Sequence, residues 1–183
     1  RSKGKVQFEY DTTVTMPYTN LSELIDMIST SSVAWHIKAV GDVREKRKSS
    51  GASQAIDRIK CKTSSVPVFP FTTNIGVVTL NANKFKITIF PDKIIVIKNN
   101  KVGILAYSDL DVAIWTTNFV ESQSVPADAT VVSQAYQYVN NNGTPDQRYK
   151  DNPLRPVCKY TTIEINSKTG FKEVLMLSKA TES

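Results

Sequence analysis

Five short β-prone runs follow one another between residues 77 and 117, and they restrict the possible folds more than any other feature. The runs are VVTL, KFKITIF, KIIVIK, VGILAY and DVAIWTT. In the second run apolar and polar residues alternate, as in a strand with one buried and one wet face. FPDK and KNNK are turn signals between runs, and Asn99-Asn100 can adopt positive φ in a tight hairpin. This spacing predicts an antiparallel meander, either a bent sheet or a partly open barrel.

The flanking segments add one short N-terminal helix and further strands. In TNLSELIDMIST, Leu21, Leu24 and Ile28 fall at helical spacing. VAWHIKAVGDV and QAIDRIKCK predict a β-hairpin, and VCKYTTIEI with FKEVLMLS predicts a closing one. The segment 126–143 is ambiguous, but its β-branched and aromatic residues favour a strand. We therefore expect an α+β fold that is mainly antiparallel β.

A proline-containing stretch, SSVPVFPF, marks the expected boundary within the 183-residue chain. Proline cannot donate to a sheet ladder, so Pro67 and Pro70 indicate an edge or crossover segment. We expect residues 1–65 to hold the helix and a basic-tipped hairpin, and residues 66–183 to hold an antiparallel β subdomain. A single compact domain is the alternative, because the length suits either arrangement.

Most of the net charge of +6 comes from residues 38–62. This segment contains eight basic and three acidic residues, which gives it a net charge of +5. Such an excess permits an acidic partner such as nucleic acid, anionic lipid or an acidic protein. The candidate basic patch at the hairpin tip is Arg44, Lys46, Arg47 and Lys48. A solvated hairpin end is the other interpretation. Residues 42–62 contain no aromatic side chain, which leaves only contact with a phosphate backbone.

A polar stretch, residues 140–156, is rich in Asn, Asp, Arg and Pro and predicts a rigid, self-bonded loop. The candidate ligand-binding residues are Asp146, Arg148, Tyr149, Asn152 and Arg155. Arginine offers planar donor forks that suit a carboxylate or phosphate. In the alternative interpretation, Arg148 pairs with Asp146 or Asp151 and only locks the loop.

We find no convincing catalytic or metal-binding pattern, so we expect no catalytic residue, no metal and no cofactor. The only histidine, His36, lies beside Trp35 in an expected strand, where a structural role is favoured. Asp109 and Asp111 would share one face of a strand, but solvated surface carboxylates are the favoured interpretation. Cys61 and Cys158 are too few for a disulfide framework, and buried free thiols are favoured over one bridge.

Three sequence blocks carry a resemblance to a known family. VAWHIKAVGDVREKRKSSGAS, FPDKIIVIKNNKVGILAYSDLDV and YVNNNGTPDQRYKDNPLRPVCKY resemble, in the same order, blocks of a widespread bacterial family of unknown function. The resemblance covers most of residues 33–178. It implies a bacterial or phage origin and a domain often attached to other segments. The β-rich middle is also similar to bacterial pleckstrin-homology-like domains, on strand pattern alone.

The sequence therefore favours a non-catalytic interaction module of a larger bacterial protein, with a protein or small acidic ligand as partner. The alternatives are a sequence-nonspecific nucleic-acid-binding domain and, third, a metal-dependent hydrolase. No apolar run reaches the ~20 residues of a membrane helix, so we expect a cytoplasmic location. Because the chain begins with Arg1 instead of Met, we expect a fragment or a processed product.

Overall fold

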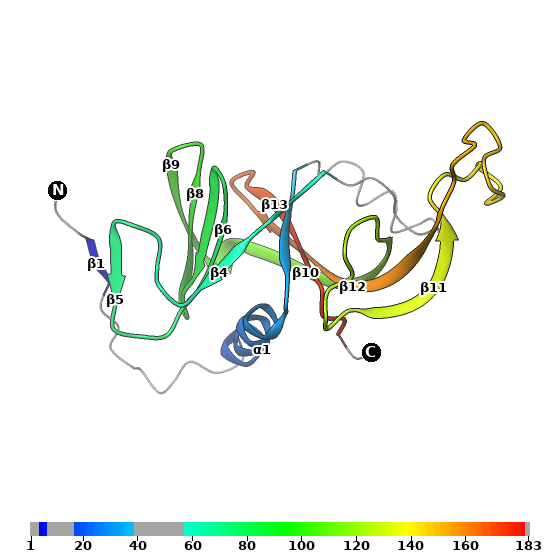
Figure 1. Cartoon of the computed structure of the whole chain (residues 1–183). Helices are drawn as coiled ribbons and strands as arrows, with labels where there is room; N and C mark the ends of the chain where they lie inside the picture. Colours follow the sequence, from blue (N-terminus) through cyan, green and yellow to red (C-terminus); the bar gives the residue numbers. More distant parts are fainter. Residues whose placement is uncertain (1–3, 7–16, 39–56, 182–183) are drawn as a thin grey trace.

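The fold is mainly antiparallel β with one N-terminal helix, as the alternating runs predict. The computed structural model describes residues 4–6, 17–38 and 57–181. These residues form a five-stranded sheet, a six-stranded sheet and a small parallel pair between β1 (Gly4–Val6) and β5 (Phe71–Thr73). Within this described part, neither large sheet closes into a barrel. Figure 1 shows the two large sheets side by side, with the helix below the place where they meet.

The five-stranded sheet has the order β4-β6-β7-β8-β9 and contains four of the five predicted runs, as β6 to β9. Its strands are β4 (Lys62–Ser64), β6 (Val78–Ala82), β7 (Phe85–Ile89), β8 (Lys93–Lys98) and β9 (Lys101–Ala106). The fifth run, DVAIWTT, lies in the six-stranded sheet, within β10 (Leu110–Val120). Asn99 and Asn100 join β8 to β9 with φ values of 50° and 64°. Both residues tolerate this left-handed backbone region better than most, so the predicted tight hairpin is confirmed.

The six-stranded sheet follows the order β10-β12-β13-β2-β3, and β11 also pairs with β12. Its strands are β10 (Leu110–Val120), β12 (Leu154–Ser167), β13 (Lys172–Leu177), β2 (Ala34–Ile37), β3 (Arg58–Lys60) and β11 (Thr130–Tyr136). Both predicted hairpins and the predicted strand within 126–143 are therefore confirmed. The tip between β2 and β3 lies outside the described residues, and so do Arg44, Lys46, Arg47 and Lys48.

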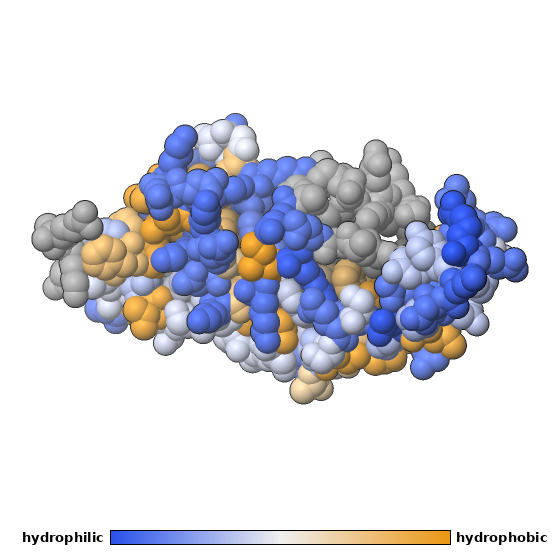
Figure 2. Space-filling model, turned by 45° about the horizontal axis from the view of Figure 1, so that its top comes forward, coloured by the Kyte–Doolittle hydropathy of each residue, from blue (hydrophilic) through white to orange (hydrophobic). Residues whose placement is uncertain are grey.

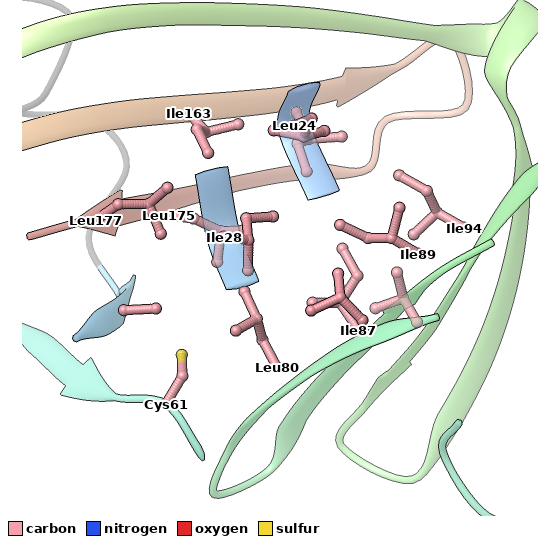
Figure 3. Packing of buried hydrophobic residues seen from close by; sticks show 14 of the residues in the cluster. Leu24, Ile28, Cys61, Leu80, Ile87, Ile89, Ile94, Ile163, Leu175 and Leu177 are labelled. Atoms are coloured by element: carbon pink, nitrogen blue, oxygen red, sulfur yellow. The ribbon is translucent and has the colours of Figure 1, made fainter. Parts of the chain in front are cut away.

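Helix α1 (Pro17–Thr30) packs into the largest hydrophobic cluster, between the two sheets. Its predicted apolar stripe is confirmed, since Leu21, Leu24 and Ile28 are all buried. Figure 3 shows Ile28 between Leu80 of the five-stranded sheet and Leu175 of the six-stranded sheet. The chain passes from β3 in one sheet to β4 in the other at a single residue, Cys61. This cluster therefore takes residues from both sides of the expected boundary at 65/66.

Two smaller clusters lie on the outer faces of the sheets. The second cluster, on the six-stranded sheet, is formed by Trp35, Ile37, Phe119, Cys158, Tyr160, Val174 and Met176. The third cluster, on the five-stranded sheet, is formed by Val68, Val77, Phe90 and Ile95. Because β2 separates the first cluster from the second, all four of its residues are buried. No helix in the described part is long and apolar enough to cross a membrane.

The expectation that Asp109 lies on a strand is wrong. Asp109 belongs to a short 3-10 turn, η1 (Tyr107–Asp109), and β10 starts after it. Asp109 and Asp111 therefore do not share a strand, which corrects the expectation that one strand face carries both. The turn is needed because β9 ends in the five-stranded sheet and β10 begins in the six-stranded one. Asp109 instead lies with its carboxylate 3.9 Å from Lys168 Nζ.

Candidate functional site

The polar stretch predicted as a binding loop forms the end of an arm, which we define as residues 130–156. β11 pairs antiparallel with the first residues of β12, and residues 137–153 connect the two strands at the tip. Figure 1 shows this arm curving away at one end of the six-stranded sheet. The predicted loop, residues 140–156, ends too late in the sequence. Residues 154–156 belong to β12 and pair with Tyr136, Ala135 and Gln134. Prolines on both sides hide this strand start in the sequence, since proline is rare inside sheets.

Arg148 pairs with Asp146, as in the interpretation in which this pair locks the loop. Its Nε donates to Asp146 Oδ1 at 2.9 Å, and its Nη2 donates to Oδ2 at 2.6 Å. The Arg148 backbone N–H also donates to Oδ1, at 3.0 Å. These bonds hold the pKa of the Asp146 carboxyl below its ordinary value. Asp146 is 5% exposed, whereas the Arg148 side chain is 83% exposed, so the arginine closes the turn and also faces solvent.

Tyr138 organises the base of the tip through backbone and ring contacts. The Asn152 side chain bonds both backbone groups of Tyr138, as a residue of a neighbouring strand would. Its Oδ1 accepts from Tyr138 N–H at 2.9 Å, and its Nδ2 donates to Tyr138 C=O at 2.8 Å. The rings of Tyr138 and Tyr149 stack at 3.9 Å with 12° between their planes. Arg155 Nε donates to Gln137 Oε1 at 3.0 Å, and Gln137 Nε2 donates to the Tyr138 hydroxyl. The structure thus gathers all five candidate ligand-binding residues, but it uses each of them inside the tip.

The surface around the tip is open and polar. Two shallow depressions flank Arg148, one lined by Asn140, Thr144 and Asp146, the other by Val139, Asn141 and Asn142. Figure 2 shows hydrophilic surface at the tip and hydrophobic surface along the lower edge of the same end of the molecule. Such open depressions suit contact with another surface better than enclosure of a small molecule.

Sequence reasoning missed the apolar residues of the arm. Val131, Val132, Tyr136 and Leu154 are all exposed. Val131 and Val132 are adjacent, and the register shifts between Val131 and Ser133, which indicates a β-bulge. The bulge places Val131 and Tyr136 on the same face of the arm, because their partners Cys158 and Leu154 lie four positions apart in β12. Strict alternation along the sequence assigns Val131 and Tyr136 to opposite faces, so it did not reveal this shared apolar face.

A buried ionic cluster also escaped the sequence analysis. Arg58 Nη2 donates to both carboxylate oxygens of Glu121, at 2.7 and 2.8 Å, and the Tyr160 hydroxyl donates to Glu121 Oε2 at 2.7 Å. The Arg58 guanidinium lies 4.2 Å from the Trp35 ring centroid and 4.4 Å from that of Phe119. These contacts form between residues far apart in the sequence, so spacing could not reveal them. The cluster joins β3 to β12 and to the residue that follows β10, and its aromatic members Trp35, Phe119 and Tyr160 belong to the second hydrophobic cluster.

His36 lies on a strand beside Trp35, as predicted, and its side chain is buried. Its Nε2 lies 2.6 Å from Glu173 Oε2, and its ring stacks on Phe85 with centroids 4.0 Å apart. Lys98 pairs with the other oxygen of Glu173. Burial alone would raise the pKa of the Glu173 carboxyl, but hydrogen bonds from His36 and Lys98 hold it below its ordinary value.

Both cysteines are free and buried, which confirms the expected thiols. Cys61 belongs to the first hydrophobic cluster and Cys158 to the second, on opposite faces of the six-stranded sheet. Burial raises the pKa of the Cys61 thiol to about 12 and also raises that of Cys158. A thiol with such a pKa is protonated at neutral pH and is a poor nucleophile or metal ligand.

The described chain is thus a mainly antiparallel β protein with an ordered, projecting arm. Among the residues that the structure places, no group of three or more His, Cys, Asp or Glu side chains is arranged to hold a metal ion. Comparison with known proteins finds no matching family model, curated protein or solved structure. The resemblance to a bacterial family of unknown function therefore stays a prediction.

Proposed function

We propose that this chain is a non-catalytic interaction module that binds a protein partner through the arm. The exposed apolar side chains of β11 support this proposal most directly, because Val131, Val132 and Tyr136 are all exposed. Leu154 on the adjacent strand is also 53% exposed. Contiguous exposed apolar side chains next to polar ones are typical of protein interaction sites.

The internal bonding of the tip supports the same proposal. Asp146, Asn152 and Gln137 satisfy neighbouring groups of the tip, so the tip needs no ligand to keep its shape. A preordered surface loses little conformational entropy on binding. Tyr149 and Arg148 then present flat aromatic and cationic groups of the kind enriched at the centres of interfaces. The bacterial family resemblance adds that the module belongs to a larger protein.

The test compares partners captured by the wild-type chain and by two surface variants. Val132→Lys places a charge on the arm, and Val66→Lys places the same charge on an exposed valine outside it. Proteins that bind the wild-type chain would be measured again, against all three chains, with purified components by calorimetry. We expect the arm variant to weaken binding at least tenfold. Equal binding of a purified partner by all three chains would contradict the proposal.

Nucleic-acid binding is the second candidate function, because a net charge of +5 gathers within residues 38–62. Its expected contacts are phosphates, so affinity for any nucleic acid should fall steeply with salt. Arg47→Ala with Lys48→Ala should flatten that salt slope by about two contacts. Affinity that depends on Val132 and varies little with salt would favour the protein-binding function.

A further inference from the structure

β9 is an edge strand whose outward backbone groups can be identified from the register. In the described part of the chain, β9 pairs only with β8. Phe90 N–H donates to Lys93 C=O at 2.9 Å, so β8 residues 93, 95 and 97 bond toward β7 and residues 94, 96 and 98 toward β9. The β8–β9 register pairs these last three with residues 105, 103 and 101. The N–H and C=O groups of Val102, Ile104 and Ala106 therefore point to the free edge.

This edge lacks the features by which proteins usually prevent edge-to-edge pairing. Charges, prolines, bulges and short length protect edge strands, but residues 102–106 are uncharged, contain no proline and pair in regular register. The other edges carry protection. β3 and β4 have three residues each and include lysines, and β11 contains the bulge. β10 exposes Asp111 and Asn118, and its exposed apolar residues Val112 and Ile114, at 36% and 43%, are less exposed than Val102 and Ile104 of β9, at 55% and 60%. β9 is thus the least protected edge among the described strands.

The side chains along the edge continue the third hydrophobic cluster. Ile104 lies opposite Ile95, a buried member of that cluster, and Val102 lies opposite Ile97, which packs against it. Yet Val102 is 55% exposed and Ile104 is 60% exposed. The apolar face of the five-stranded sheet therefore reaches its edge without being covered there by described residues.

We propose that β9 pairs antiparallel with β9 of a second copy of this chain, about a two-fold axis at Ile104. In this register Ile104 faces Ile104 of the second copy, and Val102 faces its Ala106. Both backbone groups of all three outward residues then gain partners, as an antiparallel ladder requires. The two sheets become one continuous sheet, and their third clusters meet along a shared apolar strip.

The charges in this register favour a second copy as the occupant. The paired centre is uncharged, and Lys101 at the end of β9 faces Tyr107 of the other copy instead of another lysine. An isologous contact closes after two subunits and does not propagate into filaments. A single strand pair buries less area than the ~1,200 Å² of stable interfaces. We therefore infer a weak dimer that forms reversibly as concentration rises.

Sedimentation equilibrium of opposite-charge variants tests the pairing. Because Ile104 faces its own copy, Ile104→Lys and Ile104→Glu should each be monomeric, whereas an equimolar mixture should form heterodimers. Wild type should dimerise between about 10 µM and 1 mM, the range of weak association. Val66→Lys and Val66→Glu are matched controls on an exposed valine away from the edge, and each should dimerise like wild type. A monomeric wild type at 1 mM, or a mixture that stays monomeric, would overturn the proposal.

Cysteine substitution tests the register. Ile104→Cys should crosslink to itself under mild oxidation, because facing residues have Cα atoms ~5.5 Å apart. Val102→Cys should not, because Val102 faces Ala106 and the two Val102 residues lie four residues apart along the ladder, about 13 Å. The native cysteines are both buried. Equal crosslinking of the two variants would overturn the proposed register.

Discussion

Arg58 is the residue whose surroundings most constrain what substitutions the chain tolerates. Its side chain is 6% exposed, and that of Glu121 is fully buried. Two aromatic rings flank the guanidinium, and both oxygens of one carboxylate accept from Nη2. Nη1 is also buried, and no acceptor among the described residues reaches it. A buried charge is stable only while it remains paired, so the two residues must be considered together.

Glu121→Gln should destabilise the fold by about 3–5 kcal/mol, because it leaves the Arg58 charge buried without a counter-charge. The double variant Arg58→Met, Glu121→Leu should recover most of this loss, since it removes both charges and keeps apolar volume. Urea denaturation measures both. Asp57→Asn is the control, because the Lys38–Asp57 pair is largely exposed and should contribute ~1 kcal/mol or less. A double variant as unstable as Glu121→Gln would contradict this account.

The buried glutamates predict a loss of stability in acid. Burial alone would raise the pKa of Glu121, but hydrogen bonds from Arg58, Tyr160 and Gln123 hold it below its ordinary value. The pKa of Glu173 is lowered in the same way, by hydrogen bonds from His36 and Lys98. A carboxyl group whose pKa is lower in the folded chain than in the unfolded chain stabilises the fold at pH values above its unfolded pKa of ~4.3. This contribution is lost as the pH falls through the folded pKa. The free energy of unfolding should therefore decrease below about pH 5, and less steeply in Glu173→Gln. Equal slopes for both chains would disprove the role of Glu173.

Local sequence spacing explains which of these residues could be predicted. Asp146 and Arg148 are two positions apart within a turn-rich stretch, so their pairing was an open alternative from the sequence. Arg58 and Glu121 are 63 positions apart, and only the pairing of β10, β12, β13, β2 and β3 brings them together. Periodicity reports which face is apolar, but it does not identify a polar partner across several strands.

At the scale of elements, turns fix the register of the hairpins. Gly170 closes the β12–β13 hairpin with φ 90°, and a Cβ added there would meet nothing within 4 Å. Gly170→Ala should therefore destabilise through backbone strain alone, by roughly 1–2 kcal/mol. Gly76→Ala is the matched control, since a Cβ there is also free of contacts and its φ is not positive. Thermal denaturation compares them, and equal melting temperatures would show that the turn adapts.

We expect a substitution in the arm to change amide hydrogen exchange within the arm and not in the rest of the fold. Asn152→Ala removes both hydrogen bonds to the Tyr138 backbone, so the Tyr138 amide should exchange with solvent faster. Amides of β13 should keep their protection, because that strand lies beyond the arm. Lys150→Ala, an exposed residue of the same tip, should leave exchange unchanged. Hydrogen exchange followed by NMR measures all three, and slower or unchanged exchange at Tyr138 would show that Asn152 does not hold the tip.

Element types were predictable because alternation and turn residues act locally. Four of the five meander runs, the helix and both hairpins agree with those signals, and the fifth run is a strand of the other sheet. The start of β12 at Leu154 was not predictable, since Pro153 and Pro156 indicate a loop and only pairing with β11 makes this segment a strand. The arrangement of the two sheets around α1 was likewise outside local reasoning, because it depends on contacts between distant segments.

At the scale of the whole molecule, the first hydrophobic cluster predicts cooperative unfolding across the expected boundary at 65/66. The cluster joins Leu24 of α1 to Leu80 of the five-stranded sheet and to Leu175 of the six-stranded one. β2, from the first segment, is also paired between β13 and β3. If these contacts link the segments energetically, neither sheet should unfold alone.

Leu24→Ala and Leu80→Ala, one on each side of that boundary, test this coupling. Each should cost about 2–5 kcal/mol, because each leaves a cavity in the same buried cluster. Tryptophan fluorescence reports the six-stranded sheet, where Trp35 and Trp115 lie, and far-UV circular dichroism reports all strands. In both variants the two signals should shift together to the same lower urea midpoint, as two-state unfolding requires. If Leu80→Ala shifted only the dichroism signal, the sheets would unfold separately and the chain would contain two independent units.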